Sequence, residues 1–282
     1  MPTQAAKATR FQALHQNSLP LVIGNPWDAG TARILTSLGF AALSTTSAGL
    51  AFTLGRRDAT RSVSRDEALA NARSIVQATH LPVAADLENG YGDAPEVVAE
   101  TIRLAAESGL VGGSIEDATG DPAHPIYDLH HAVERVAAAS DAARALGFPF
   151  MLVARAENYL HGRHDLDDTI RRLKAFEAAG AEVLYAPGIT HHEDIRTLCA
   201  SVTKPVNVLV GLKGSPPLSV QDLGALGVRR ISLGSGFCRA AYTAFVHAAC
   251  EVMDRGTFGF SADSLYMSEL ADLFKQPEGR QP

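Results

Sequence analysis

The chain has 282 residues, of which 46% are hydrophobic and 20% are charged, and its formal net charge is −6. This composition is that of a folded globular protein and excludes a disordered or fibrous chain. The negative charge comes without any run of basic residues, which excludes a broad attraction to nucleic acid or to an anionic membrane surface and favours a small molecule as the partner.

The cysteines and the beginning of the chain bear on its compartment. Cys199, Cys238 and Cys250 form no CxxC pair and have no histidine at a zinc-site spacing, so reduced thiols are expected. The first residues lack the apolar stretch of a signal peptide, and no stretch approaches the ~20 apolar residues of a membrane span. We therefore predict a cytoplasmic protein that does not enter a membrane.

Short apolar runs recur along the chain and are separated by segments with helical spacing. In chain order the runs are residues 21–23, 41–43, 83–85, 111–115, 150–154, 183–185, 206–210 and 230–233. Between them, apolar residues three or four positions apart mark one face of a helix, as in Val98, Ile102 and Ala105. This alternation predicts βα units with right-handed crossovers and a parallel sheet.

Capping residues mark the expected helix boundaries. Ser64 with Glu67 has the spacing of a capping box, and Asp93 is expected to cap a helix that has Pro95 in its first turn. Gly109 is expected to end that helix in the left-handed conformation. Glycines also follow four other helical stretches, at positions 39, 147, 180 and 227.

The number of units favours a closed sheet. An open sheet that binds a dinucleotide would carry a GxGxxG turn after an early strand, but the turn after residues 21–23 lacks it. We predict a single (β/α)8 barrel domain of TIM type over residues 1–282, with a C-terminal helical extension over about residues 237–282. The apolar residues Phe245 and Met253 of this extension could pack on the barrel or on a neighbouring subunit.

Acidic residues follow the expected strands, where a barrel places its active site. Asp86 and Glu88 follow the third run, Glu116 and Asp117 follow the fourth, and the loop after the second run leads to Asp58. Clustered carboxylates repel each other unless a cation or protons neutralise them, and oxygen ligands favour Mg²⁺ or Mn²⁺. The alternative is that these acids are helix caps and salt-bridge partners.

Polar groups after other strands could bind an anionic substrate. Arg155 ends the fifth run and could clamp a carboxylate, or could instead form a salt bridge to Glu157 or Glu116. The small residues 44–49 after the second run could direct backbone N–H groups at an anionic oxygen, or could form a plain turn. Asn207 and Lys213, after the seventh run, are further candidates at the same rim. None of the five lysines directly ends a strand run, which disfavours a Schiff-base aldolase.

Taken together, these motifs resemble the isocitrate lyase and phosphoenolpyruvate mutase superfamily over about residues 10–255. The resemblance rests on the order and spacing of five blocks: residues 45–49, 54–58, 86–92, 115–117 and 154–155. It implies a Mg²⁺ shell, held partly through water, from four acids: Asp58, Asp86, Glu88 and Glu116. It also implies that a 2-oxo acid binds at the turn of Thr46, Ser47 and Ala48, and that Arg155 binds its other end or the leaving group.

Departures from the family pattern bear on the reaction. Glu88 stands where the family usually has an aspartate. The loop 118–128 lacks the Lys-(Lys/Arg)-Cys-Gly-His signature of isocitrate and methylisocitrate lyases, and it lacks the lysine and asparagine of the phosphonopyruvate enzymes. Tyr127 or His124 of this loop could donate a proton, or both could be surface residues.

The resemblance leads us to expect a Mg²⁺-dependent carbon–carbon lyase for a small 2-oxo or 2-hydroxy dicarboxylate. It would cleave a C–C bond or decarboxylate an oxaloacetate-type substrate through a pyruvate enolate, with Arg155, Asp58 and Glu116 as catalytic residues. The alternatives are a phosphonopyruvate or phosphoenolpyruvate mutase or P–C hydrolase, and a protein that only binds 2-oxo acids. The resemblance also implies a homo-oligomer, a tetramer with exchanged C-terminal helices.

Overall fold

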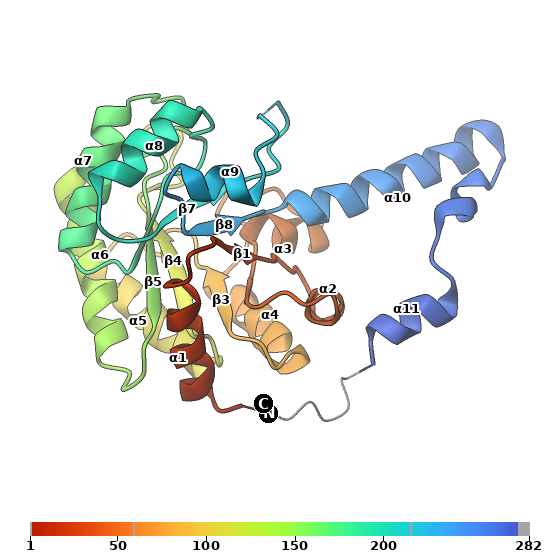
Figure 1. The fold of residues 1–282 in the computed structure, drawn as a ribbon, viewed down its shortest axis with the longest axis horizontal. Helices are drawn as coiled ribbons and strands as arrows, with labels where there is room; N and C mark the ends of the chain where they lie inside the picture. The colour runs from red at the N-terminus through yellow and green to blue at the C-terminus, as the bar shows by residue number, and fades with distance from the viewer. Residues whose placement is uncertain (1, 59, 215, 276–282) are drawn as a thin grey trace.

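The strands form one closed parallel barrel. The computed structural model describes residues 2–58, 60–214 and 216–275. The strands are β1 (Leu21–Ile23), β2 (Leu43–Ser44), β3 (Val83–Asp86), β4 (Gly112–Glu116), β5 (Met151–Arg155), β6 (Val183–Tyr185), β7 (Val206–Leu209) and β8 (Arg230–Ser232). They pair in the order β1-β8-β7-β6-β5-β4-β3-β2, and a parallel bridge between Gly24 and Leu43 joins the two ends. The predicted TIM-type barrel is confirmed (Figure 1).

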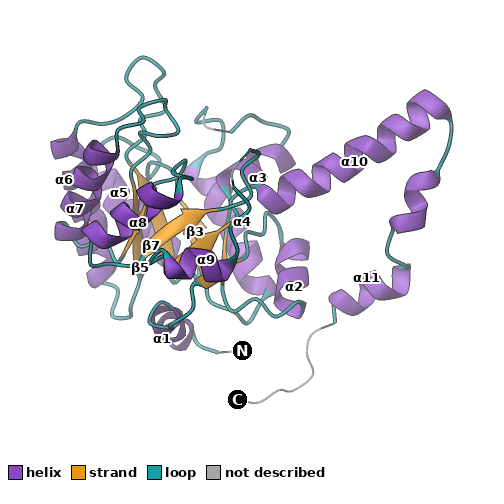
Figure 2. Cartoon of the chain, turned by 45° about the horizontal axis from the view of Figure 1, so that its top comes forward, coloured by secondary structure: helices purple, strands orange, loops and turns teal. Residues whose placement is uncertain are grey.

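Helices surround the strands, as Figure 2 shows. Their bounds within the described residues are α1 (Gln4–Leu14), α2 (Ala29–Ser37), α3 (Ser47–Thr53), α4 (Arg65–Ala78), α5 (Pro95–Glu107), α6 (Leu129–Arg144), α7 (Leu166–Ala178), α8 (His192–Ser201), α9 (Val220–Ala225), α10 (Gly236–Arg255), the 3-10 turn η1 (Gly259–Asp263) and α11 (Met267–Leu273). Among the described residues, none of these helices is both long enough and apolar enough to cross a bilayer.

Local capping explains most helix boundaries, with one correction. Ser64 and Glu67 form the predicted capping box of α4, and Gly109 follows α5 with φ +91°. The prediction that Asp93 caps α5 is wrong, because Ala94 occupies the cap position and supplies no side-chain hydrogen bond. The Asp93 carboxylate instead accepts hydrogen bonds from Arg61 and from the Tyr127 hydroxyl, which come from distant loops.

Inward-facing side chains fill the barrel, and α1 closes its amino-terminal end. Alternate residues of β1, Leu21 and Ile23, pack in the same cluster as Tyr185 of β6 and as Ala8 and Phe11 of α1. The other faces of the strands pack against the surrounding helices in a separate, larger cluster. The barrel interior near α1 is therefore mostly apolar, with buried Arg230 of β8, whose guanidinium lies over the Phe11 ring, as a charged exception. The acidic residues are concentrated toward the carboxyl ends of the strands.

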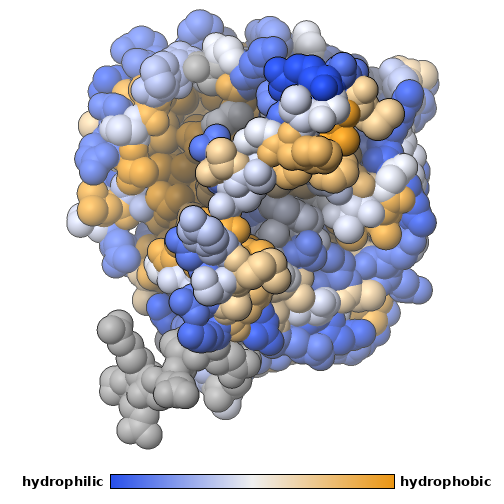
Figure 3. All heavy atoms as spheres, turned by 90° about the vertical axis from the view of Figure 1, so that its right-hand side faces the viewer, coloured by the Kyte–Doolittle hydropathy of each residue, from blue (hydrophilic) through white to orange (hydrophobic). Residues whose placement is uncertain are grey.

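The C-terminal helix α10 extends away from the barrel (Figure 1). Its first turn is anchored by buried Cys238 and by Phe237, whose ring packs edge-on against Phe40 at 6.2 Å. Further along, Phe245 and Met253 are 69% and 82% exposed. Figure 3 shows apolar surface among hydrophilic residues on the face from which this helix projects. Residues 276–282 of the predicted extension lie outside the described residues, and the predicted tetramer stays a prediction.

Candidate active site

A cavity of about 230 Å³ opens at the carboxyl ends of the strands and reaches into the barrel. Most of the predicted site residues line it: Thr46, Ser47, Ala48, Asp58, Asp86, Arg155 and Asn207. Glu88 and Glu116 lie beside it and interact with Arg155. A larger groove of about 600 Å³, bordered by Leu14 and Phe40, has no titratable side chain in its lining. We therefore place the chemistry in the smaller cavity.

The Asp86 carboxylate is fixed by the neighbouring turn. Its Oδ2 accepts a hydrogen bond from the Ser47 hydroxyl at 2.9 Å, and its Oδ1 accepts one from the Glu88 N–H at 3.2 Å. The Asp86 N–H donates to the Thr45 hydroxyl at 3.1 Å. Because Thr46 caps α3, which begins at Ser47, the turn after β2 and the end of β3 hold each other in place. Asp86 is thus positioned before any ligand binds.

Arg155 gathers three carboxylates on one guanidinium. Its Nη1 lies 3.0 Å from Asp86 Oδ1 and 3.2 Å from Glu116 Oε2, and its Nε lies 2.8 Å from Glu157 Oε1. The Arg155 side chain is only 12% exposed, so water screens these pairs weakly. Arg155 therefore forms both of the salt bridges that were expected as alternatives, to Glu116 and to Glu157. One guanidinium thus faces three carboxyl groups.

Burial, together with neighbouring negative charges, shifts Glu88 and Glu116 toward their protonated forms. Burial, together with the charges of Asp86 and Asp58, raises the pKa of Glu88 to about 7. Burial also raises the pKa of Glu116 well above its usual value, although Arg155 opposes this. Glu88 has a left-handed backbone, with φ +48°, which is uncommon for a residue other than glycine. Strain and charge repulsion are therefore concentrated at this rim, as is common at functional sites.

The donor chemistry of this rim suits a divalent cation. Carboxylate oxygens are the ligands of Mg²⁺ and Mn²⁺, and a cation would relieve the repulsion among Asp86, Glu88 and Glu116. Within the described ranges, however, no three acidic, histidine or cysteine side chains already converge as direct ligands. Mg²⁺ usually keeps several waters and takes only one or two carboxylates. These acids therefore fit a shell that is completed by water.

Asp117 follows Glu116 directly but points the other way. Its carboxylate is 2% exposed and accepts hydrogen bonds from Arg172 of α7 at 3.0 Å and from the Glu157 N–H at 2.8 Å. Arg172 also binds Asp168 at 2.9 Å. These contacts connect the ends of β4 and β5 to α7, on the side away from the cavity. Sequence reasoning grouped Asp117 with the rim acids and missed Arg172, although strand alternation places Glu116 and Asp117 on opposite faces.

The loop 118–128 is attached to the rim from outside the cavity. The Tyr127 hydroxyl donates to Asp93, and the side-chain amide of Asn89 donates to Tyr127 at 3.2 Å. His124 is 85% exposed and lies 3.3 Å from Asp121. Tyr127 therefore attaches the loop to Asp93 and Asn89, and His124 lies on the surface. Neither residue lines the cavity.

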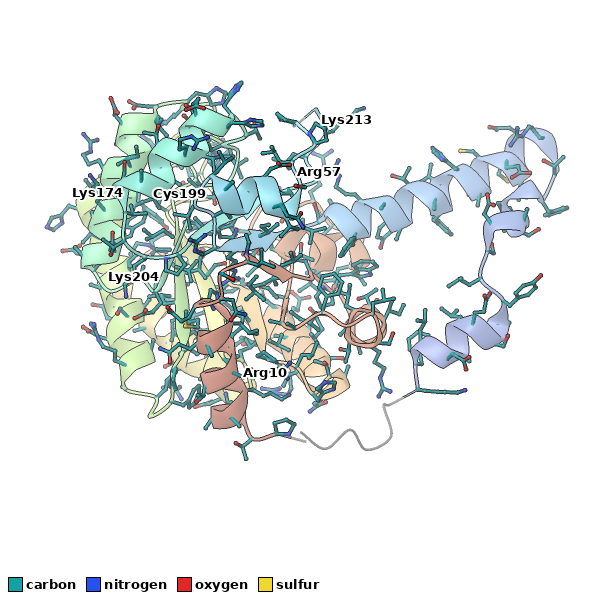
Figure 4. All side chains as sticks on the ribbon, viewed as in Figure 1. Arg10, Arg57, Lys174, Cys199, Lys204 and Lys213 are labelled. Carbon is teal, nitrogen blue, oxygen red and sulfur yellow. The ribbon has the colours of Figure 1, made fainter. Side chains whose placement is uncertain are left out.

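None of the five lysines, all within the described residues, lines the cavity, although Lys213 directly follows Leu212, which does. Lys7 donates to the Thr79 carbonyl near α1, and Lys275 pairs with Asp272 in the C-terminal segment. Lys174 is exposed on α7, Lys204 pairs with Glu182, and Lys213 is exposed on the loop after β7, as Figure 4 shows. This placement agrees with the expectation that the site does not use a Schiff base.

Two polar residues deeper in the cavity have buried atoms without a hydrogen-bond partner among the described residues. The Asn207 amide nitrogen donates to the Ser232 hydroxyl at 2.9 Å, but its Oδ1 is buried and accepts no hydrogen bond from the described residues. Arg230 of β8 is 5% exposed, and its Nε and Nη1 are also unpaired within this part of the chain. Sequence reasoning counted Arg230 as part of an apolar strand. The only signal was an arginine at an inward-facing position.

Comparisons with known proteins agree with this geometry. The family model described as phosphoenolpyruvate phosphomutase matches residues 11–253. A crystal structure from Burkholderia cenocepacia J2315, described as a lyase/mutase, is 55% identical, covers 97% of both chains and has a TM-score of 0.94. Oxaloacetate decarboxylase from Bradyrhizobium sp. (strain BTAi1) is 30% identical over 74% of this chain and 70% of that protein. Oxaloacetate acetylhydrolase in complex with oxalate is 25% identical, covers 97% and 95% of the two chains and has a TM-score of 0.86.

Proposed function

Because this chain belongs to the phosphoenolpyruvate phosphomutase family, within the isocitrate lyase and PEP mutase superfamily of enzymes, we propose that it is a Mg²⁺-dependent lyase for a short 2-oxo or 2-hydroxy dicarboxylate. The observation that carries this proposal is the cluster of Asp86, Glu116 and Glu157 around Arg155 at the mouth of a small cavity. The cavity, at about 230 Å³, is smaller than the pockets of drug-sized ligands, which suits a small organic acid.

Relatives with named activities support a diacid substrate. One is an oxaloacetate decarboxylase, and another is an oxaloacetate acetylhydrolase solved with oxalate. Both names point to oxaloacetate, a four-carbon 2-oxo diacid. We therefore place oxaloacetate and its 2-hydroxy analogues first among the candidate substrates. The loop 118–128 lacks the cysteine of the isocitrate lyase signature, which favours decarboxylation or a cleavage that needs no thiol base.

The residues of this chain would each have a defined role. Asp86, Glu88, Glu116 and Asp58 would hold Mg²⁺, partly through water. Bound Mg²⁺ would polarise the 2-oxo group and stabilise the negative charge that develops as a C–C bond breaks. Ser47 holds Asp86 in position, and Arg155 fixes Asp86 and Glu116 on the same side of the cavity. The turn at Thr46, Ser47 and Ala48 lines the cavity where it would orient the 2-oxo acid.

We also propose a single-domain architecture over residues 1–282 and a cytoplasmic homo-oligomer. The exposed apolar residues of α10, such as Phe245 and Met253, support an assembly that covers them. Size measurement by light scattering tests this proposal independently of the activity. A tetramer that dissociates when both residues are changed to serine would support the predicted role of the helix.

The first experiment is a turnover panel of oxaloacetate and other 2-oxo and 2-hydroxy diacids, with and without Mg²⁺. Wild type is compared with Asp86→Ala and with Asp141→Ala, in which the same change is made to an exposed residue of α6. We expect Mg²⁺-dependent release of pyruvate or an equivalent 2-oxo acid in the wild type and in Asp141→Ala. Asp86→Ala should lose about 10³-fold in kcat/KM, on the scale of losing a group that stabilises developing charge.

Other outcomes would select the alternatives. If the diacids are inert while phosphonopyruvate is consumed to phosphate or phosphoenolpyruvate, the protein is a P–C hydrolase or a mutase. If pyruvate or oxalate binds tightly and none of these compounds turns over, the protein only binds 2-oxo acids. Turnover of a diacid that persists in Asp86→Ala would remove this rim from the reaction.

A further inference from the structure

Arg230 carries a positive charge into the inner end of the cavity. It is the first residue of β8 and pairs in register with Leu21 of β1 and Asn207 of β7. Its guanidinium lies over the Phe11 ring of α1 at 5.8 Å from the ring centre, so the side chain lies inside the barrel near its amino-terminal end. Arg230 also lines the same cavity as Arg155. The two arginines thus reach one cavity from opposite ends.

The Arg230 charge is not balanced by an acid. Its Nε and Nη1 are buried and make no hydrogen bond to the described residues. The titratable groups that interact with it are the Tyr185 hydroxyl and the His15 ring, and burial with the Arg230 charge lowers the pKa of His15 to about 4. Both groups are therefore neutral near pH 7. A buried guanidinium without an acid or a hydrogen bond is costly, so an acceptor from outside the chain is expected to compensate it.

The contrast with Arg155 indicates what the cavity can bind. Arg155 already contacts Asp86, Glu116 and Glu157, so it has little attraction left for an anion. Among the residues that line the cavity, Arg230 is the other cationic side chain. An anion that enters the cavity is therefore repelled by the rim acids, unless a cation is bound there, and attracted by the inner end.

Asn207 can complete the same subsite. Its Oδ1 has no partner, while its Nδ2 donates to the Ser232 hydroxyl at 2.9 Å. Rotating the amide by half a turn would turn Oδ1 toward the Ser232 hydroxyl and would place Nδ2, a donor, where Oδ1 now lies without a partner, since an amide offers both a donor and an acceptor. Arg230 and Asn207 would then present donors to one carboxylate.

We propose that Arg230, assisted by Asn207, binds the substrate carboxylate that the metal does not take, and so selects a dicarboxylate over a monocarboxylate. This inference rests on the proposed function, in which the metal at the rim takes the carboxylate next to the 2-oxo or 2-hydroxy group. It makes Arg230 the residue that determines the class of substrate. The competing explanation is that ordered water satisfies these buried groups.

Equilibrium binding tests the subsite without requiring turnover. Calorimetric titration with Mg²⁺ present compares malate, a 2-hydroxy diacid, with lactate, its monoacid counterpart. Arg230→Met should weaken malate binding about 10- to 100-fold, the range of a lost charge-assisted contact, and should change lactate binding less than about twofold. The matched control is Arg229→Met, because Arg229 lies beside it in the sequence and its side chain donates only to the Val228 carbonyl among the hydrogen bonds of the described residues.

A second variant protects the test against misfolding. Asn207→Asp would place a carboxylate next to Arg230, where it would replace the substrate anion. It should abolish selective malate binding and raise the melting temperature of the ligand-free protein. Arg230→Met should melt at or above the wild-type temperature, because it removes an unbalanced buried charge.

The outcomes separate this subsite from the lyase proposal. Unchanged malate affinity in Arg230→Met would overturn the subsite, and so would failure of malate to bind the wild type or an equal loss for malate and lactate. If Arg230-dependent malate binding is found but the turnover panel is inert, the subsite stands and the lyase proposal fails. If a diacid turns over with the same kcat/KM in Arg230→Met, the lyase proposal stands and the subsite fails.

Discussion

Two clusters of arginine and acid lie next to each other in this barrel and differ in how well they are balanced. The cavity-side cluster is Arg155 with Asp86, Glu116 and Glu157. The helix-side cluster is Arg172 with Asp117 and Asp168. The two share a strand end, because Glu116 and Asp117 are consecutive residues of the chain. Arginine and acidic residues therefore form two clusters, one on the cavity side and one on the helix side of the end of β4.

The difference between the clusters lies in what remains unsatisfied. In the helix-side cluster, Asp117 accepts hydrogen bonds from Arg172 and from the Glu157 N–H, and Arg172 also binds the Tyr127 carbonyl at 3.0 Å. In the cavity-side cluster, three acids share one guanidinium, whereas Asp168 of the helix-side cluster also pairs with a second arginine, Arg171. Burial raises the pKa of an acid in both clusters, to about 7 for Asp117 and well above its usual value for Glu116, so the contrast lies in the number of acids per arginine. A buried cluster in which each charge has a partner holds the fold together. A buried cluster with surplus negative charge can instead bind a ligand that compensates this charge.

The largest expected effect comes from breaking the helix-side cluster. Asp117→Ala removes the carboxylate that accepts hydrogen bonds from the buried Arg172 guanidinium and from the buried Glu157 N–H. Removing one partner of a buried ion pair typically costs about 3–5 kcal/mol, so the free energy of unfolding should fall by that amount. Urea denaturation followed by circular dichroism measures it. Asp141→Ala, at an exposed pair with Arg144, should cost less than about 1 kcal/mol. A loss below 1 kcal/mol in Asp117→Ala would refute the contrast.

Substitution of Glu116, the residue before Asp117, should have the opposite effect: it should reduce activity and leave stability nearly unchanged. Glu116→Gln replaces a carboxyl group that burial already shifts toward its neutral form with a neutral amide of similar shape, so the free energy of unfolding should stay within about 1 kcal/mol of the wild type. The kcat/KM for the diacid identified by the panel should fall about 10²–10³-fold, because the metal shell loses a charge. Steady-state kinetics at several Mg²⁺ concentrations measures this loss. A stable variant with wild-type kinetics would show that Glu116 has no part in the reaction.

The pH dependence of stability provides a third test of the imbalance. Burial, with the charges of Asp86 and Asp58, raises the pKa of Glu88 to about 7 from its usual value near 4.5. Between these values the folded protein keeps a proton that the unfolded chain has released. The stabilisation is therefore complete below about pH 4.5 and is lost as the pH rises through about 7, by at most about 3 kcal/mol. Urea denaturation of the metal-free protein at pH 5 and pH 8 measures this. Glu88→Gln should reduce the difference, and burial also raises the pKa of Asp117 to about 7, so part of it should remain. A wild-type protein that gains stability relative to Glu88→Gln as the pH rises would contradict it.

The sequence predicted the parts of this comparison that depend on local patterns. Each of the eight apolar runs overlaps a strand, the second of them only at Leu43, and the capping box at Ser64 and Glu67 formed. Asp86 and Glu116 lie at one rim, whereas Asp117 points away from it. These features follow from the two-residue period of strands and from the position of strand ends in a barrel. They require no knowledge of which distant side chains meet.

The partners of charged residues were not predictable from such patterns. Asp93 was expected to cap a helix, but Arg61 and Tyr127 reach it from other loops. Arg155 was given two possible partners and has three. The isolation of Arg230 depends on side chains from α1, β6 and β7, so a single strand segment could not reveal it. Whether a charge is balanced is a property of the assembled barrel.

The smallest expected effect comes from exchanging Glu88 for the usual residue of the family. Glu88 has a left-handed backbone with φ +48°, and aspartate occurs in this conformation several-fold more often than most residues do. A several-fold preference corresponds to less than about 1 kcal/mol, so Glu88→Asp should raise the free energy of unfolding by about that much at pH 8. If Glu88 contacts the metal through water, as proposed, the shorter side chain should change the Mg²⁺ concentration for half-maximal activity less than about tenfold. A much larger change would mean that Glu88 binds the metal directly. The left-handed backbone would then be retained with glutamate because the longer side chain is needed at the rim.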